Sequence, residues 1–247
     1  MSEPTETTES TQLPPRIALA WGLRERGSRG PKPGLSLERI VAAGIEVADA
    51  DGLVAVSMAR VAKQLGAGTM SLYRYVGGKD DLVALMVDGA MAEPPDLGAP
   101  GQTWSNGLRR WALSLRERYG SHRWALEVPI SSILFGPNNA RWLEQALRAL
   151  ASTPLSEQHK LSTVLLVSGF VRNEATLMAD FESTAETQKA LQGYGATLAR
   201  LIDAETFPAL ARAIASGALE DEDAPDAEFE FGLTRILHGI EALIRAY

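Results

Sequence analysis

The chain has no cysteine among its 247 residues and only three histidines. Disulfides, zinc–thiolate centres and cysteine nucleophiles are therefore excluded. Aromatic residues make up 6% of the chain, and no apolar run approaches the roughly 20 residues of a membrane-spanning helix. The N-terminal stretch, MSEPTETTESTQLPP, is polar and acidic, the opposite of a signal peptide's basic and then apolar order. These features predict a cytoplasmic protein without a membrane segment.

Charge is distributed unevenly along the chain. The formal net charge is −7 at pH 7, yet residues 16–79 hold ten Lys and Arg against five Asp and Glu. Residues 80–247 hold fourteen against twenty-three. A basic segment joined to an acidic one indicates an anion-binding part and a second part with another task.

The apolar pattern is helical from Ser36 onward. Ser36 and Gly52 bracket one amphipathic stretch, and Ser57 and Gly66 bracket a shorter one, as an N-cap and a stop would. Further helices are expected within 69–76 and 77–93, and at about 103–119, 122–128, 138–151, 156–182, 186–203, 206–216 and 227–247. No segment has convincing strand alternation. The sequence therefore predicts an all-α fold.

Two of the predicted helices are short and are separated by about three residues, with a glycine at the end of the first, which fits a helix-turn-helix. In that motif the second helix enters the DNA major groove with its N-terminal residues against base edges. Here those residues are Thr69, Met70 and Ser71. The two hydroxyls can bond to bases, and the methionine can touch a thymine methyl group. Leu72 and Val76 are expected to face inward.

Basic residues flank this motif on both sides. Lys79 begins the following helix, and an arm before the motif carries Arg24, Arg26, Arg29 and Lys32, as minor-groove arms do. Helix-turn-helix geometry also occurs in proteins that never meet DNA, and a basic arm alone is usually a solvated linker. Spacing by itself leaves both alternatives open.

Residues 36–86 resemble the DNA-binding domain of the TetR family of bacterial one-component repressors. The run from Ile40 to Ala50 and the segment VSMARVAKQLGAGTMSLYRYVGGKDDL carry the resemblance. It implies base-reading roles for Thr69, Met70, Ser71 and Tyr73, and roles at or near phosphates for Ser57, Arg60, Tyr75 and Lys79. The chain departs from the family at Ala59, where a basic residue is common and the arginine is displaced by one position.

The last helix, FEFGLTRILHGIEALIRAY, resembles the final helix of the tetracycline-repressor subgroup. That resemblance implies packing with residues 156–182 and with the same two helices of a second chain. An apolar stripe from Phe229 to Tyr247 agrees with it, and residues 156–182 are apolar on two sides. A helix of a single-chain core is the alternative. A homodimer would suit a near-palindromic operator in double-stranded DNA.

Four tryptophans, Trp104, Trp111, Trp124 and Trp142, lie in the predicted helices between residues 103 and 156, and aromatic side chains suit a mostly apolar small-molecule site. Core packing is the alternative. The expected lining comprises Trp111, Leu115, Trp124, Phe135, Trp142, Leu166, Phe170 and Asn173. The magnesium-binding histidine of the tetracycline-repressor subgroup falls near Pro129. A magnesium–tetracycline complex is therefore not expected, nor any other metal or cofactor.

An all-α enzyme, such as a di-iron bundle, is the competing class. It needs Glu-x-x-His pairs, and none of His122, His159 and His238 follows a glutamate by three residues. No catalytic residues are predicted. The expected organisation is a disordered N-terminus and basic arm (1–35), a three-helix helix-turn-helix DNA-binding domain (36–80) and a larger helical effector-binding and dimerisation domain (81–247).

The predicted function is that of a DNA-binding transcriptional regulator, a repressor released from its operator by a small apolar or aromatic ligand. The second alternative is a helical module that binds a ligand or a partner without binding DNA.

Overall fold

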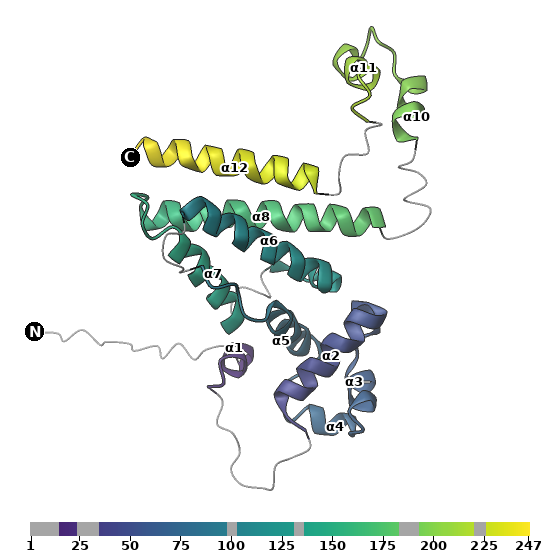
Figure 1. The fold of residues 1–247 in the computed structure, drawn as a ribbon. Coiled ribbons are helices and arrows are strands. Elements are labelled where there is room, and N and C mark those ends of the chain that lie inside the picture. Colours follow the sequence, from purple (N-terminus) through teal and green to yellow (C-terminus); the bar gives the residue numbers. More distant parts are fainter. Residues whose placement is uncertain (1–14, 24–34, 98–102, 131–135, 183–192, 220–225) are drawn as a thin grey trace, which may run out of the picture. The chain divides into compact units, whose positions relative to one another are not determined.

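The computed structural model describes residues 15–23, 35–97, 103–130, 136–182, 193–219 and 226–247. Every regular element in these ranges is a helix, which confirms the predicted all-α fold (Figure 1). The chain forms two compact units. The first comprises residues 1–94 and 127–142, and the second comprises residues 95–126 and 143–247.

The first unit contains the short helices of the predicted motif. Its elements are α1 (Pro15–Ala20), α2 (Leu37–Asp51), the 3₁₀ helix η1 (Leu53–Ala55), α3 (Met58–Gln64), α4 (Thr69–Leu72) and α5 (Lys79–Met91). Serines begin α2 and α3, as the sequence predicts. Ser36 Oγ accepts a hydrogen bond from the backbone N–H of Arg39, and Ser57 Oγ accepts one from Arg60, each at 3.2 Å. These bonds satisfy amides that have no partner inside the helix.

The core of the first unit lies where α2 packs against α5. Ile40 and Val47 of α2 are buried there, as are Leu82 and Met86 of α5. Gly44 of α2 faces Met86 so closely that a Cβ at this glycine would lie 2.7 Å from the methionine sulfur. The absence of a side chain at Gly44 therefore allows the two helices to approach.

Asp88 is a buried acid that joins α5 to the start of α7 (Pro137–Ala149). One oxygen of its carboxylate accepts hydrogen bonds from the backbone N–H groups of Asn138 and Asn139, both at 3.0 Å. The Asn138 side chain donates to the Asp88 carbonyl at 2.9 Å. Burial raises the pKa of Asp88, and the two amide bonds offset part of that rise. Asp88 thus caps the first turn of α7 from another helix.

The second unit is built on α8 (Glu157–Glu182), against which α6 (Trp104–Ser121) and α12 (Ala227–Arg245) pack. Figure 1 shows that α8 and α12 run antiparallel. One face of α8 is buried, with Val164, Val167 and Val171 at helical spacing. Leu161 and Leu165 of the same helix are exposed.

Two arginines of α6 hold the first turns of α12. Arg109 pairs with Glu230 and donates to Thr234 Oγ1 at 2.9 Å. Arg116 pairs with Asp226 at 2.6 Å. The N-terminal end of α12 is therefore fixed by charged contacts as well as by apolar packing.

The remaining elements agree with the predicted helices to within a few residues. α10 (Tyr194–Leu201) and α11 (Pro208–Ala215) pack against each other. The predicted helix over 186–203 includes residues 186–192, which lie outside the described residues. Residues 122–128 form a 3₁₀ helix, η2 (Arg123–Glu127), in place of a regular α-helix.

Candidate DNA-binding surface and effector cavity

A glycine turn joins α3 to α4. Gly66 has a φ of +63°, in the left-handed region that glycine adopts without steric penalty. The backbone N–H of Ala67 donates to the carbonyl of Ala62 at 2.9 Å and closes the turn. Leu72 and Val76 are buried, as predicted, and hold α4 against the unit. This arrangement is a helix-turn-helix.

The residues predicted to read bases lie together on α4 and at Tyr73, the residue that ends it. Met70 is the most accessible, with 77% of its surface exposed, and Tyr73 is exposed three residues later. Thr69 and Ser71 are half-buried on either side of Met70. Because the buried Leu72 faces the core, these four side chains occupy the remaining surface of one short helix.

Ser57 and Arg60 lie in the first turn of α3. Ser57 is exposed and its oxygen accepts the capping bond, so its hydroxyl hydrogen remains available as a donor to a phosphate. Arg60 Nη2 lies 2.7 Å from Asp51 Oδ2 at the end of α2. Ion pairs between exposed side chains are weak in water. A phosphate can therefore compete with Asp51 for this guanidinium.

The other predicted phosphate contacts lie beyond α4. Tyr75 Oη donates to the carbonyl oxygen of Leu35 at 3.0 Å, which ties the end of the motif to the start of α2. Lys79 is exposed in the first turn of α5. The four predicted arm residues, Arg24, Arg26, Arg29 and Lys32, lie outside the described residues.

The predicted tryptophan lining is buried but divided between the units. Trp111, Leu115 and Trp124 are buried in the second unit. Trp142 is buried in the first, where its Nε1 donates to the carbonyl oxygen of Met91 at 3.1 Å. Buried contacts of this kind also satisfy the requirements of core packing.

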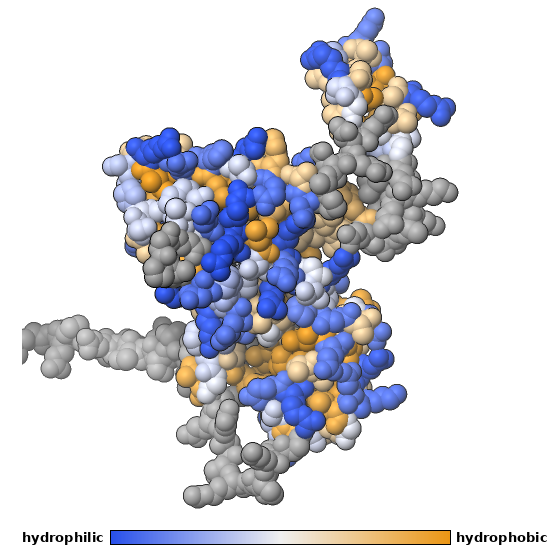
Figure 2. All heavy atoms as spheres, viewed as in Figure 1, coloured by the Kyte–Doolittle hydropathy of each residue, from blue (hydrophilic) through white to orange (hydrophobic). Residues whose placement is uncertain are grey.

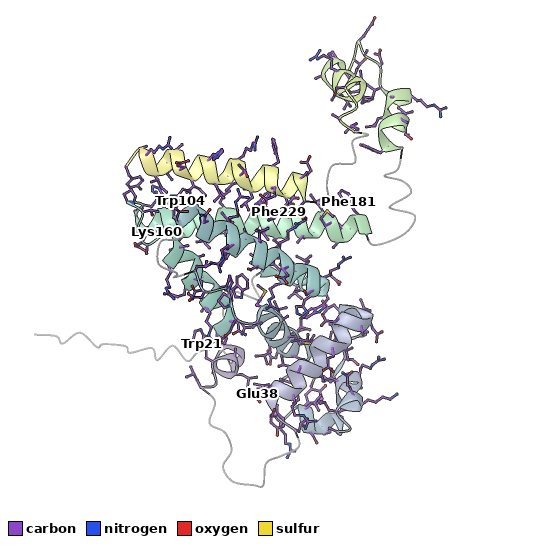
Figure 3. All side chains as sticks on the ribbon, viewed as in Figure 1. Trp21, Glu38, Trp104, Lys160, Phe181 and Phe229 are labelled. Atoms are coloured by element: carbon purple, nitrogen blue, oxygen red, sulfur yellow. The ribbon has the colours of Figure 1, made fainter. Side chains whose placement is uncertain are left out.

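The predicted lining residues of α8 point in different directions. Phe170 is half-buried against Phe229, with ring centroids 5.4 Å apart. Phe229 lies at the start of α12 and is directed towards α8 (Figure 3). Leu166 and Asn173 lie on the exposed side of α8, and Phe135 is outside the described residues. The structure therefore does not bring all of the predicted lining to one place.

A cavity of about 310 Å³ lies in the second unit between α6 and α8. Its lining includes Leu113, Arg116, Glu117, Arg123, Met178 and Asp226, none of which was predicted from the sequence. On α6 these positions form a mixed polar and apolar stripe with helical spacing. Such a stripe is typical of a solvated helix face, so its spacing gave no signal of a cavity.

An exposed apolar surface runs along α8 and α12. Leu165 is 73% exposed on α8 and Phe231 is 57% exposed on α12. The surface comprises Leu161, Leu165, Leu166, Leu177 and Phe181 of α8, with Phe231, Leu243 and Tyr247 of α12 and beyond. Figure 2 shows apolar side chains at the surface in this region among polar ones. Several large exposed apolar side chains on two packed helices favour an interaction site.

Within the described residues no helix is long and apolar enough to cross a membrane.

Known proteins resemble this chain over nearly its whole length. Residues 40–86 match the family described as "Bacterial regulatory proteins, tetR family", and residues 97–244 match "Tetracyclin repressor-like, C-terminal domain". The HTH-type transcriptional repressor DrrR1 of Streptomyces coeruleorubidus is 38% identical, over 97% of this chain and 90% of its own.

The fold has solved relatives as well. ActR of Streptomyces coelicolor in complex with actinorhodin matches with a TM-score of 0.73 and 31% identity, covering 87% of this chain and 99% of that chain. The same protein in complex with (S)-DNPA matches with a TM-score of 0.71 and 31% identity, over 85% and 98%.

Proposed function

This chain belongs to the TetR family of bacterial DNA-binding transcriptional regulators, and we propose that it is a repressor released from its operator by a small apolar or aromatic molecule. The observation that carries this proposal is the helix-turn-helix formed by α3, Gly66 and α4, with Met70 and Tyr73 exposed on its second helix. The repressor would act in the cytoplasm, where bacterial DNA lies.

The predicted DNA-binding residues of the first unit form two groups, one that contacts base edges and one that contacts phosphates. Thr69, Met70, Ser71 and Tyr73 read base edges from α4. Ser57, Arg60, Tyr75 and Lys79 contact phosphates, together with the arm residues Arg24, Arg26, Arg29 and Lys32. Phosphate contacts fix the register of the protein on the duplex, whereas base contacts select the sequence. For Tyr75, a phosphate bond would replace or share its present bond to Leu35.

The regulator acts as a homodimer on a near-palindromic site, with residues 36–80 on DNA and residues 81–247 carrying the effector and dimer functions. The exposed apolar surface of α8 and α12 supports this assembly. Gly169 of α8 and Gly239 of α12 have open space where a Cβ would stand. Small residues of this kind let helices of a second copy approach closely. A two-fold dimer matches paired half-sites.

The effector is proposed to bind in the second unit. Two features support an apolar or aromatic ligand. One is the cavity between α6 and α8, and the other is the presence of the buried Trp111 and Trp124 close in sequence to the lining residues Leu113 and Arg123. The complexes of ActR with actinorhodin and (S)-DNPA show that a relative of this chain binds small molecules. The ligand must prefer one conformation of the protein, because equal affinity for both shifts nothing. Couplings of about 1–3 kcal/mol are typical.

The test of DNA binding uses the promoter region upstream of the chain's own gene, with a shuffled duplex as control. Each phosphate neutralised contributes about −0.9 to the slope of log K against log salt. A dimer with several phosphate contacts in each half-site should therefore bind the promoter tightly and lose affinity steeply as salt rises. Failure to shift this DNA would favour a helical module without DNA binding. Binding that does not weaken with salt would contradict the proposed phosphate contacts.

The test of effector coupling is a tryptophan fluorescence titration against a panel of hydrophobic compounds, repeated with operator DNA bound. A quench whose midpoint moves to higher ligand concentration in the presence of DNA is expected, because linkage is reciprocal. An unmoved midpoint would remove the allosteric claim and leave only a binding site.

A further inference from the structure

The cavity between α6 and α8 already holds a carboxylate. Asp226, the residue before α12, lies at its edge, with Oδ1 2.6 Å from Nη1 of Arg116. A guanidinium group presents its N–H donors in a planar fork that matches carboxylate geometry. Asp226 therefore occupies a place that a carboxylate from outside the protein can also take.

The two members of this pair are held very differently. The Arg116 side chain is only 22% exposed, and its guanidinium carbon lies 4.5 Å from the centre of the Phe229 ring. The Asp226 side chain is 72% exposed and makes no capping bond to α12. Stacking on an aromatic ring fixes the arginine, whereas an exposed carboxylate gains little from an ion pair in water. The carboxylate of another molecule can therefore replace that of Asp226 on Arg116 at little cost in free energy.

The walls of the cavity favour an apolar body behind the charged group. α8 contributes Ala175, Met178 and Ala179, and α6 contributes Leu113 and the buried Tyr119. The volume of about 310 Å³ lies at the lower end of the range of about 300–1,000 Å³ that small-molecule sites occupy. We therefore expect an apolar ring system beside the charged group.

The other charged side chains of the lining do not favour a ligand of either charge. Arg123 and Glu117 both border the cavity and carry opposite charges. Selection for a charged ligand therefore falls to Arg116, whose present partner is replaceable.

We propose that this cavity binds an aromatic carboxylate whose charged group replaces that of Asp226 on Arg116. The start of α12 then loses one of its two ties to α6 and keeps the bonds of Arg109 to Glu230 and Thr234. The effect of this change on DNA, unlike the binding itself, rests on the regulator function proposed above.

Binding is measured by isothermal titration calorimetry on the full chain with 2-naphthoate and anthracene-2-carboxylate, each compared with its uncharged primary alcohol. In the wild-type chain each carboxylate should bind more tightly than its alcohol by about tenfold, because hydrogen bonds to charged groups are stronger than neutral ones. Arg116→Gln should remove this preference and leave the affinity for the alcohols unchanged.

Asp226→Asn should have the opposite effect, because it removes the competing charge. The affinity for both carboxylates should rise severalfold, with the alcohols again unchanged. Arg110→Gln is the matched control, since Arg110 is an exposed arginine of α6 that does not line this cavity and donates to the carbonyl of Asp96 at 3.5 Å. If Arg116→Gln does not fold, Arg116→Lys replaces it and should reduce the preference in part.

Several results would overturn this site. They are failure of both carboxylates to bind the wild-type chain, equal binding of carboxylates and alcohols, or weaker carboxylate binding by Asp226→Asn. A gel shift on the same wild-type preparation examines DNA binding separately. If the chain prefers carboxylates but shifts no DNA, the site stands and the repressor function is wrong. If it shifts DNA but shows no preference for carboxylates, the repressor function stands and the site is wrong.

Discussion

The two units differ in what they leave on their surfaces. In the first unit few large apolar side chains outside α4 are exposed, among them Val54 of η1, which is 90% exposed, and Trp21 and Leu23 after α1. In the second unit such side chains gather on two packed helices, with Leu161, Leu165, Leu166, Leu177 and Phe181 on α8 and Phe231 and Leu243 on α12. Single exposed apolar residues are normal in folded proteins, whereas a group of them on packed helices favours an interface.

The units also differ in how their helices are joined. In the first, Gly44 and Met86 let α2 and α5 come close, and the only buried acid among its described residues, Asp88, caps a neighbouring helix. In the second, Arg109 and Arg116 tie α6 to α12 through partly exposed ion pairs. Each unit contains both kinds of contact, because Arg60 pairs with Asp51 in the first and Gly232 faces the Phe170 ring in the second. The ion pairs of the second unit differ in joining helices that are far apart in the sequence, so the exchange of one pair with a ligand would loosen α6 from α12.

The largest expected effect comes from a charge on the exposed apolar surface. Leu165→Glu should keep the fold, because surface substitutions usually change stability by about 0.5 kcal/mol or less. It should raise the dimer dissociation constant by more than about 100-fold, since burying an unpaired charge costs several kcal/mol. Sedimentation velocity measures the change. Val54→Glu is the matched control in the first unit, and an unaltered dimer in Leu165→Glu would mean that α8 does not form the interface.

A second experiment compares two glycines of α12 in the monomeric Leu165→Glu background. A Cβ at Gly232 would lie 2.6 Å from the Phe170 ring, whereas Gly239 has no atom within 4 Å. Gly232→Ala should lower the free energy of unfolding by about 1–3 kcal/mol through overpacking. Gly239→Ala should raise it by up to about 1 kcal/mol through helix propensity. Urea unfolding measures both, and equal effects would show that Phe170 moves aside without cost.

A third experiment separates base reading from phosphate contact in the first unit. Ser71→Ala should alter the preferred bases by roughly 1 kcal/mol, because one hydroxyl bond is lost. Lys79→Ala should weaken all sequences about equally and reduce the salt slope by about 1 per half-site. Competition binding with a randomised operator library measures both. The assigned roles are wrong if Lys79→Ala changes the preferred sequence while Ser71→Ala does not.

The smallest expected effect concerns the pH dependence of Asp88. Burial raises its pKa in the folded chain above the ordinary 3.8, so the folded state binds this proton more tightly than the unfolded state. The resulting stabilisation is present below pH 3.8 and is lost as pH rises through the folded-state pKa. Asp88→Asn cannot titrate. The free energy of unfolding of the wild type minus that of the variant should therefore fall across this window.

Urea unfolding of both chains from about pH 3.5 to about pH 7 measures this difference and cancels the titration of groups common to both. The amides of Asn138 and Asn139 and the charge of Arg141 act against burial. A difference that grows with pH would mean that these three together outweigh it.

Much of the fold could be predicted because its signals are local. Ser36 and Ser57 begin helices through hydrogen bonds to amides three residues away. Gly66 stops α3 through its own left-handed backbone conformation. The sequence determined less well which side of each helix is buried. Leu165 has the spacing of a core residue and lies in solvent, because periodicity defines a stripe but not which neighbour covers it.

The two candidate sites differ in the same way. The α4 surface could be predicted because all its residues lie within one short segment. The cavity beside Arg116 could not, because it is lined by residues of α6, α8 and the start of α12. Trp111 and Trp124 do not line this cavity, because large aromatic side chains are favoured in cores as well as in ligand sites, and their contact with an effector stays a prediction.

The sequence by itself determined the helical class, most of the helix starts and the helix-turn-helix, because caps, turns and periodicity act over a few residues. The tertiary structure alone decided that Asp88 meets the start of α7, 50 residues away, and that Arg116 meets Asp226, 110 residues away. Those contacts depend on how whole helices pack, and packing is set by the sum of many weak contacts spread along the chain. No short stretch of sequence contains that sum.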